Sequence, residues 1–484
     1  MSCVAVTCTG KSCRSKGKHV FAKYRSCGIA SHMVQVQRMA SLVVPNGQGS
    51  PAPPEHPLNP GVSPLVPAVI IVENGIVRKR STMKRNEKPT YIHGARGNYR
   101  IIRKIGHGAY GTVYEVELDG IRYAINQQQS TDAGTAMSRS ALVEADVMSR
   151  LEHPNLVRML EVFFEGGRST SINYVMEREE LTLRGMTSIQ SPNIIKALAF
   201  QLICAVNFLH THCVIHADIK PENILLSNSQ QGYRLKLADF GLSQYNMGQA
   251  KSLEVQTFWY RAPEIWKRDR NYTTAIDMWS IGLILRELLV CRPLSSSRSE
   301  KTYFQTIQSL LGSVPEVGKD LTGTKKDWDP VEWGEYIRLI NGCLVYDPTM
   351  RLTAVDLLNS SLFSRCELPT GSSYLENVTP PQHKDIHKLL RDWTVPHSSY
   401  HASTLALAVN LFDRAKEAGD ISSSEEKEIA LGALNIALKI NQRIPLPSNS
   451  FSTMIGRSKF TVGEMWNLEA RVAQLLGFRF YIGK

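Results

Sequence analysis

Two short stretches of the sequence hold polar residues whose types and spacing suit the transfer of a phosphoryl group. VIHADIKPENILL contains Asp218, Lys220 and Asn223, and LKLADFGLS contains Asp239. An aspartate can accept the proton of a hydroxyl group, and a lysine two residues later can lie beside the transferred phosphate. An asparagine and a second aspartate can bind magnesium. The order and spacing of these residues favour this chemistry over a set of ordinary polar loop residues.

A glycine-rich loop that could cover the phosphates of a nucleotide precedes these residues. The stretch IGHGAYGTVYEV places Gly106, Gly108 and Gly111 at the G-x-G-x-x-G spacing. Glycines let the backbone close over a polyphosphate with its amides facing inward. The loop leads into a predicted hairpin, whose two strands are joined by the turn Asp119-Gly120. The second strand ends in Asn126 and three glutamines, so it brings no cation to the phosphates.

Length and charge limit the architectures and partners that the chain can have. With 484 residues it has room for two or three domains, each with its own core. Residues 1–99 hold 14 Lys and Arg against three Glu, so 11 of the net +12 charges lie there. The near-neutral remainder argues for a basic arm and against a nucleic-acid-binding domain. We find no apolar run long enough to cross a membrane and no secretory signal.

The first 95 residues are predicted to form a basic, proline-rich and disordered tail. Residues 46–67 are too rich in proline to pack. The basic cluster Arg78 to Arg85 is of the nuclear-import type, although a simple solvated charge run has the same composition. We therefore expect an intracellular protein, in the nucleus or the cytoplasm. Cysteines at positions 3, 8, 13 and 27 match no common zinc spacing, and an acid-free start is also typical of organelle-targeting peptides.

From about Tyr99 to Phe363 the chain resembles the eukaryotic protein kinases. VQTFWYRAPEI, YTTAIDMWSIGLIL and YDPTMRLTA are similar to the later motifs of that family and follow in the same order. Lys220 and Thr257 fit its serine/threonine class. SRSALVEADVMSRLEHPNLVRMLEVF is similar to the cyclin-binding helix of cyclin-dependent kinases. The resemblance implies an α+β, bilobal protein kinase fold that uses ATP and Mg²⁺.

The resemblance also implies a role for each residue of the site. Asp218 would be the catalytic base, Lys220 the cation of the transition state, and Asn223 and Asp239 the magnesium ligands. Residues implied to surround the nucleotide are Ile105, Gly106, Gly108, Gly111, Val113, Ala124, Asn126, Glu144 and Leu225.

Three further expectations concern residues around this site. Glu264 and Arg351 would form a buried ion pair, and Asp277 would brace the catalytic loop. Arg261 would help to favour proline just after the phosphorylated residue.

The sequence departs from the family pattern at positions that bind phosphate. Asn126 stands where the family has the lysine that binds the α- and β-phosphates and pairs with Glu144. An amide can still bond to Glu144 but offers no charge, and the nearest basic residues in sequence are Lys104 and Arg122. The three arginines that would hold a phosphorylated activation loop are replaced by Val143, Ala217 and Gln244. We therefore do not expect phosphorylation of Ser252 to be the switch.

The last hundred residues have a purely helical pattern of apolar residues, and Thr461 with Glu464 predicts a capping box. A generic helix bundle would give the same periodicity. From about His383 to Phe480, however, LLRDW, TLALAVNLFDR, ALKINQRIP and EMWNLEARVAQLLGFRF are similar to a cyclin box, in family order. The resemblance implies one all-α, five-helix domain that grips a kinase through Lys439 and Glu469.

These patterns predict a tail at 1–95, a protein kinase domain at 96–365, a linker at 366–382 and a cyclin-like domain at 383–484. We interpret the chain as a cyclin-dependent-type serine/threonine kinase that carries its own cyclin box and phosphorylates protein substrates. Activity is expected to be weak because of Asn126. Two alternatives are a pseudokinase scaffold and a cyclin-like regulator that acts in trans on another kinase. No membrane or specific nucleic-acid partner is expected.

Overall fold

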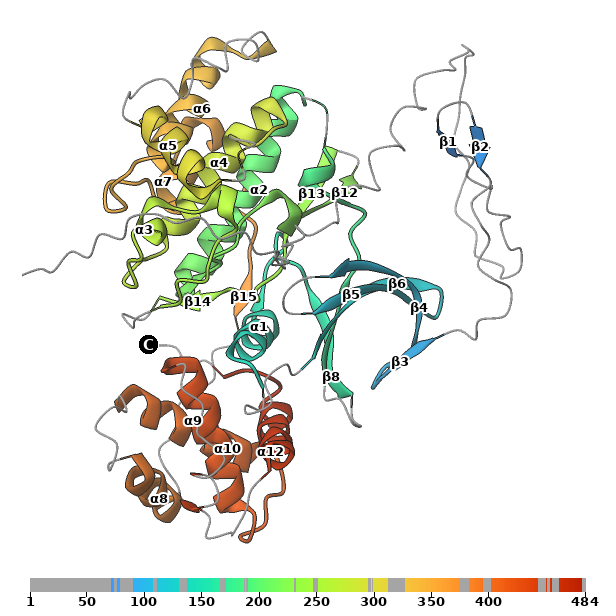
Figure 1. Ribbon diagram of the computed structural model, residues 1–484, viewed down its shortest axis with the longest axis vertical. Helices are drawn as coiled ribbons and strands as arrows, with labels where there is room; N and C mark the ends of the chain where they lie inside the picture. The colour runs from blue at the N-terminus through green and yellow to red at the C-terminus, as the bar shows by residue number, and fades with distance from the viewer. Residues whose placement is uncertain are drawn as a thin grey trace, which may run out of the picture.

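The computed structural model describes residues 71–73, 76–78 and 90–480, with gaps at 108–110, 130–136, 166–170, 187, 189, 230–231, 247–250, 295–296, 298, 312–326, 374–382, 395–401, 443–449, 451–452 and 455–460. Most of the basic tail and its cysteines lie outside these residues, as does Gly108. A short hairpin, β1 (Ile71–Glu73) with β2 (Ile76–Arg78), precedes the main body. That body has three parts: a sheet, a large helical lobe and a smaller group of C-terminal helices (Figure 1).

The first lobe is a six-stranded antiparallel sheet in the order β3-β4-β5-β6-β9-β8. Its strands are β3 (Tyr91–Gly94), β4 (Gly97–His107), β5 (Thr112–Leu118), β6 (Ile121–Gln129), β8 (Met159–Glu165) and β9 (Ser171–Glu177). Strand β3 lies before residue 96, so the sheet begins earlier than the expected domain boundary. Asp119 and Gly120 have φ of 52° and 78°, the positive values that a tight hairpin turn requires. The predicted hairpin is confirmed.

A single helix, α1 (Arg139–Arg150), crosses this lobe between the sheet and the C-terminal helices (Figure 1). It begins at Ser138, whose side chain accepts a hydrogen bond from the amide of Ala141 at 3.1 Å. Tyr174 of β9 donates to the carbonyl of Ala141 at 2.9 Å and so ties the helix to the sheet. Most of the helix is buried, because both of its sides are covered.

The second lobe is built around the long helix α2 (Pro192–Thr211). The other elements of this lobe are β10 (Leu181–Thr182), β11 (Val214–Ile215), β12 (Ile224–Ser229), β13 (Gly232–Leu237), β14 (Gln244–Tyr245), α3 (Pro263–Trp266), α4 (Ala275–Val290), α5 (Glu300–Leu311), α6 (Pro330–Cys343) and α7 (Ala354–Leu358). By length and hydropathy α2 meets the criteria for a membrane span, although no such span was expected from the sequence. Leu198, Leu202 and Leu209 are at most 1% exposed, so packing inside the lobe accounts for this composition.

After the second lobe the chain forms one more short strand and then the C-terminal helices. Strand β15 (Ser372–Ser373) pairs antiparallel with β7 (Leu151–Glu152), directly after α1. The described helices of the last part are α8 (Lys384–Thr394), α9 (Ala402–Ala418), α10 (Glu426–Asn441) and α12 (Val462–Leu475). The capping box of Thr461 and Glu464 is present. Gly432 lets α10 approach α12, because a Cβ there would lie 3.1 Å from Val472.

Candidate active site and the domain interface

The catalytic loop is held by the buried carboxylate of Asp277 at the start of α4. This carboxylate accepts hydrogen bonds from the amides of His216 at 2.8 Å and Ala217 at 2.9 Å. Ala217 has a φ of +64°, a strained value for a residue with a side chain. The two bonds to Asp277 stabilise that conformation and so fix the position of the next residue, Asp218. The expected bracing role of Asp277 agrees with this geometry.

Asp218 lies at the centre of a compact set of polar contacts. Its Oδ2 is 2.5 Å from Nζ of Lys220, and its Oδ1 accepts from the hydroxyl of Thr257 at 2.8 Å. Asn223 donates its amide to the backbone carbonyl of Asp218 at 2.9 Å. Burial disfavours the charge on Lys220, but the carboxylates of Asp218 and Asp239 outweigh it, so the pKa of Lys220 is raised. Lys220 therefore carries a full positive charge at neutral pH.

The second carboxylate of the predicted set lies on a rigid turn. Asp239 has a φ of +70° and accepts from the amide of Gly241 at 3.3 Å. The ring of Phe240 packs against that of His216, with centroids 5.3 Å apart, and this contact fixes the turn to the catalytic loop. Among the described residues no three His, Cys, Asp or Glu side chains gather as a metal cluster. Magnesium usually binds one or two protein ligands together with substrate phosphates, and Asn223 with Asp239 is a donor set of that kind.

Glu144 of α1 is bound by two amides where the resemblance implies a lysine. Asn126 donates to its Oε1 at 3.3 Å, and Gln128 donates to its Oε2 at 2.5 Å. The sequence predicted the first contact and missed the second, although Asn126 and Gln128 share a face of β6. Burial and the nearby charge of Asp239 raise the pKa of Glu144 to about 8, although the hydrogen bonds from Gln128 and Asn126 act to lower it. Helix α1 is thus held inward without an ion pair.

One face of the six-stranded sheet carries three of the residues predicted to surround the nucleotide, Val113, Ala124 and Asn126. Strand register places Val113 opposite Asn126 and Ala124 opposite Met176. Opposite residues of antiparallel strands point to the same face, so these side chains line one surface. The register also sets Gly106 opposite Val113. Leu225 on β12 and Ile105 on β4 are partly buried, while Gly108 lies outside the described residues.

A close approach of the backbone explains one glycine of the loop. A Cβ on Gly111 would lie 2.4 Å from the carbonyl oxygen of Gln127 and 3.0 Å from Oδ1 of Asn126. Only glycine fits between β5 and β6 there.

Of the two nearest basic residues in sequence, Arg122 pairs with another carboxylate and Lys104 is exposed, so neither replaces the missing lysine. Arg122 points to the same face as Asn126 but binds Oε1 of Glu115 at 3.0 Å, and Arg103 binds the same carboxylate at 2.6 Å. Lys104 is exposed on β4.

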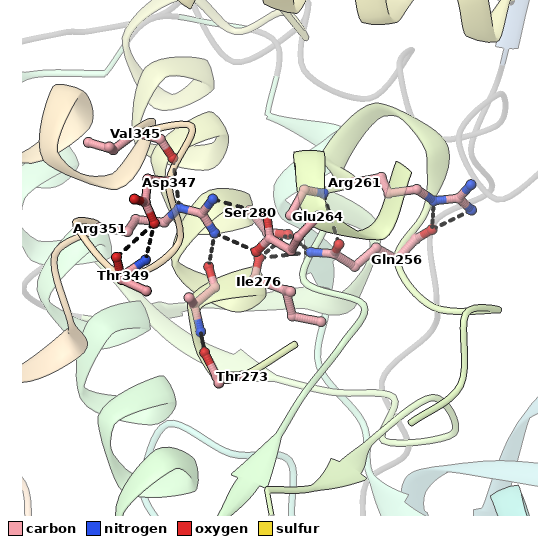
Figure 2. Close-up of polar contacts among 12 residues, drawn as sticks. Gln256, Arg261, Glu264, Thr273, Ile276, Ser280, Val345, Asp347, Thr349 and Arg351 are labelled. Carbon is pink, nitrogen blue, oxygen red and sulfur yellow. Dashed lines mark hydrogen bonds and ion pairs between the residues drawn. The ribbon is translucent and has the colours of Figure 1, made fainter. Parts of the chain in front are cut away.

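The segment that follows the catalytic loop has a fixed backbone around Gln256 (Figure 2). Gln256 has a φ of +58°, and its carbonyl accepts from Nη2 of Arg261 at 3.0 Å and from Nε at 3.2 Å. Its side chain is also bound, because Nε2 donates to the carbonyl of Ile276 and Oε1 accepts from the amide of Ala262. The left-handed conformation turns the Gln256 carbonyl toward Arg261, where both of its hydrogen bonds are made.

The same view shows the predicted ion pair between Arg351 and Glu264 (Figure 2). The guanidinium binds both carboxylate oxygens, at 2.8 and 3.1 Å, and its Nε donates to the carbonyl of Val345. Both side chains are nearly fully buried. This pairing joins the end of the segment to the C-terminal part of the second lobe.

The C-terminal helices contact the first lobe through buried polar groups at the start of α1. Nζ of Lys439 lies 2.6 Å from Oε1 of Glu469 and donates to the carbonyl of Met137 at 2.8 Å. Oε2 of Glu469 accepts from the amide of Met137 at 2.8 Å. The lysine and the glutamate are 3% and 0% exposed, so this contact lies inside the interface. The two residues predicted to grip a kinase therefore bind the backbone just before the helix.

An aromatic contact and one backbone bond extend this interface along α1. The ring of Phe164 on β8 packs against Trp466 and Phe478, with centroid distances of 4.6 and 5.5 Å. The amide of Phe480 donates to Oδ1 of Asp146, in the middle of α1, at 2.6 Å. The sequence did not predict this contact between residues that are far apart in the chain.

Comparisons with known proteins agree with this architecture. Residues 99–363 match the family described as "Protein kinase domain", and residues 364–481 match "Cyclin, N-terminal domain". The chain is 33% identical over 294 residues to human "Cyclin-dependent kinase-like 4", covering 55% of this chain and 75% of that protein. It is 33% identical over 310 residues to "Cyclin-dependent kinase 4 homolog" of Caenorhabditis elegans, covering 57% and 74%.

A plant relative is similar over a smaller share of its own length. "Cyclin-dependent kinase G1" of Arabidopsis thaliana is 29% identical over 317 residues, which are 58% of this chain and about half (51%) of that protein. The chain belongs to the protein kinase family. Its kinase domain is of the cyclin-dependent, serine/threonine type, and a cyclin box follows in the same chain.

Proposed function

We propose that this protein transfers the γ-phosphate of ATP to serine or threonine residues that are followed by proline, and that its own cyclin box activates it in cis. The observation that carries the first part is the complete contact set around Asp218. This carboxylate is oriented to accept the proton of a substrate hydroxyl, and Lys220 lies beside it to neutralise the transferred group. When bound, magnesium would add charge neutralisation at the phosphate oxygens, with Asn223 and Asp239 as its protein ligands.

The preference for proline follows from the backbone around Gln256. A substrate peptide that binds along the segment after the catalytic loop would present the backbone N–H of the residue after its serine toward the carbonyl of Gln256. The Gln256 carbonyl already accepts twice from Arg261, so it offers that amide no partner. Proline has no N–H and loses nothing there, whereas another residue leaves a donor unpaired at about 1–3 kcal/mol. This corresponds to a preference of about 5- to 150-fold in kcat/KM.

Activation in cis is supported by the buried contacts of Lys439 and Glu469 with Met137. They hold the start of α1, whose Glu144 faces the catalytic site. The linker also keeps the two domains at an effective concentration on the order of millimolar, which would saturate a contact of micromolar affinity. A regulator acting in trans would have to expose this surface, which the chain's own kinase domain covers.

A pseudokinase scaffold remains the competing proposal, because Asn126 brings no charge to the phosphates. Against it stand the intact set around Asp218 and the inward position of α1. The test is transfer of labelled phosphate to a Ser-Pro peptide and to its Ser-Ala counterpart, with Asp218→Asn protein as the control. We expect transfer by the wild type alone, at least fivefold faster to Ser-Pro. Equal rates for the two peptides would contradict the proline preference, and no transfer above the control would support the scaffold.

For location in the cell we propose nuclear import through the basic cluster Arg78 to Arg85. The full chain fused to a fluorescent protein is expected in the nucleus. Replacing the five basic residues of the cluster by glutamine is expected to leave it in the cytoplasm, and an unchanged distribution would contradict the proposal.

A further inference from the structure

One buried carboxylate joins three elements that are far apart in the sequence. Asp146 lies in the middle of α1 and is 0% exposed. Its Oδ1 accepts from the amide of Phe480, at the end of the cyclin box, at 2.6 Å. Its Oδ2 accepts from the hydroxyl of Tyr245, in the segment after the catalytic loop, and from Nε of Arg150 at 3.3 Å. We call the segment that follows the catalytic loop the activation segment. The cyclin box binds one oxygen of Asp146, and the activation segment binds the other.

Tyr245 is placed so that this bond can position the catalytic loop. It is 3% exposed and belongs to β14, which pairs with β11, the strand just before His216. Burial, together with the charge of Asp146, holds the pKa of Tyr245 well above its usual value, so its hydroxyl stays a donor. Next to it, Gln244 occupies a position where the family resemblance implies an arginine that would hold a phosphorylated loop.

The outer part of the segment is fixed by the second lobe through contacts that involve no phosphate. The ammonium of Lys251, 4% exposed, donates to the carbonyl of Tyr272 at 2.7 Å. The hydroxyl of Tyr272 donates to the carbonyl of Ser252 at 2.7 Å. Arg270 is a guanidinium near this point that the sequence did not predict, and its Nη1 reaches the carbonyl of Lys251 at 3.5 Å.

We propose that Asp146 is a positioning residue through which docking of the cyclin box holds Tyr245, and with it the activation segment, without phosphorylation of Ser252. A buried carboxylate needs donors, and docking supplies one of them as the amide of Phe480. Tyr245 and Arg150 supply the others from the kinase domain. Because Asp146 lies on α1, the same side chain links docking to the helix that carries Glu144. The inference rests on the proposed kinase function and on docking in cis.

The first test is Tyr245→Phe in the full chain, which removes one hydroxyl and keeps the ring. We expect kcat/KM for a Ser-Pro peptide to fall about 10- to 100-fold, the effect of one charge-assisted hydrogen bond, with the KM for ATP within about twofold. The matched control is Tyr336→Phe, which removes another buried hydroxyl, bound to Leu285 at 3.1 Å in the second lobe. That control is expected to lower thermal stability and leave kcat/KM for the peptide unchanged.

Two further variants separate this device from phosphorylation. Ser252→Ala is expected to keep wild-type activity. Combining Asp146→Ala with Tyr245→Phe is expected to be no worse than Asp146→Ala alone, because the carboxylate that Tyr245 binds is already absent. The proposal is overturned if Tyr245→Phe keeps its kcat/KM within twofold, or if Ser252→Ala loses as much activity as Tyr245→Phe.

A readout that needs no catalysis keeps this proposal distinct from the proposed function. In an Asp218→Asn background, amide hydrogen exchange at residues 244–246 is measured with and without Tyr245→Phe. We expect the added variant to raise exchange there at least tenfold while α4 stays unchanged. Unchanged exchange overturns the role of Asp146, whether or not the wild-type protein transfers phosphate. A silent wild type with the expected exchange contradicts only the kinase function.

Discussion

The side-chain amide of Asn126 lies 3.3 Å from Oε1 of Glu144, where the family resemblance implies a lysine and a glutamate paired by charge. Gln128 donates to the other oxygen of the same carboxylate, so each oxygen is bound by a neutral side-chain amide. The arrangement separates two tasks that one lysine would perform. The inward position of α1 is kept by amides, and the charge for the phosphates is lost.

Replacing Asn126 by lysine is expected to restore that charge. The lost lysine would have made one or two charge-assisted hydrogen bonds, worth about 1.5–3 kcal/mol each, so transfer in the wild type is slowed about 10- to 10⁴-fold. Asn126→Lys is therefore expected to raise kcat at least tenfold and to leave adenine binding nearly unchanged. Peptide phosphorylation and nucleotide titration measure the two effects.

The control for this variant is Gln127→Lys, which adds the same charge to the opposite face of β6 and is expected to change neither value. An Asn126→Lys protein that binds ATP but is as inactive as Asp218→Asn would support the scaffold instead of the enzyme.

Removing both residues that bind Met137 is expected to detach the cyclin box. In Lys439→Ala combined with Glu469→Ala, the amide and the carbonyl of Met137 lose their partners, at about 1–3 kcal/mol for each group left buried. We expect kinase activity to fall at least about tenfold. The measurement is peptide phosphorylation, together with thermal unfolding to show that both domains remain folded.

The matched control for the interface is a second ion pair of the cyclin box, between Glu425 and Arg471 at 2.5 Å. Both side chains are more than a third exposed, so replacing them by alanine is expected to change stability little and activity not at all. Full activity in the Lys439 and Glu469 double variant would show that docking does not activate the kinase.

Arg261 is expected to set the preference for proline. Arg261→Leu releases the carbonyl of Gln256, which can then accept from the amide of a residue other than proline. The ratio of kcat/KM for Ser-Pro to that for Ser-Ala peptides is expected to fall toward one. This change is expected to come mainly from faster phosphorylation of the Ser-Ala peptide. A ratio that is unchanged in the variant would place the selectivity elsewhere.

Local patterns predicted most of the fold and of the site. The alternation of apolar residues and the turn Asp119-Gly120 defined a hairpin, and the capping box marked the start of α12 at Thr461. Lys439 and Glu469 were predicted from motif resemblance, which also implied the pair of Glu264 with Arg351. These features depend on neighbouring residues or on motifs whose spacing is visible in a single chain.

What the sequence did not predict depends on contacts between distant segments. Gln128 was read as the absence of a charge, although its strand parity with Asn126 was a usable signal. The bond of Phe480 to Asp146 and the pairing of β15 with β7 join residues more than two hundred positions apart. Such contacts are set by how the domains pack, and a short polar segment such as Ser372–Ser373 carries no periodicity that would mark a strand.

The central claim is that the chain is a complete kinase with its activator attached, and dilution tests it most directly. Phosphate transfer to a Ser-Pro peptide is measured per molecule of protein from about 10 µM to 1 nM, with Asp218→Asn protein as the blank. A cyclin box docked in cis predicts constant activity per molecule, because the tether sets the local concentration. Activity that falls in proportion to dilution, or never rises above the blank, would contradict the account.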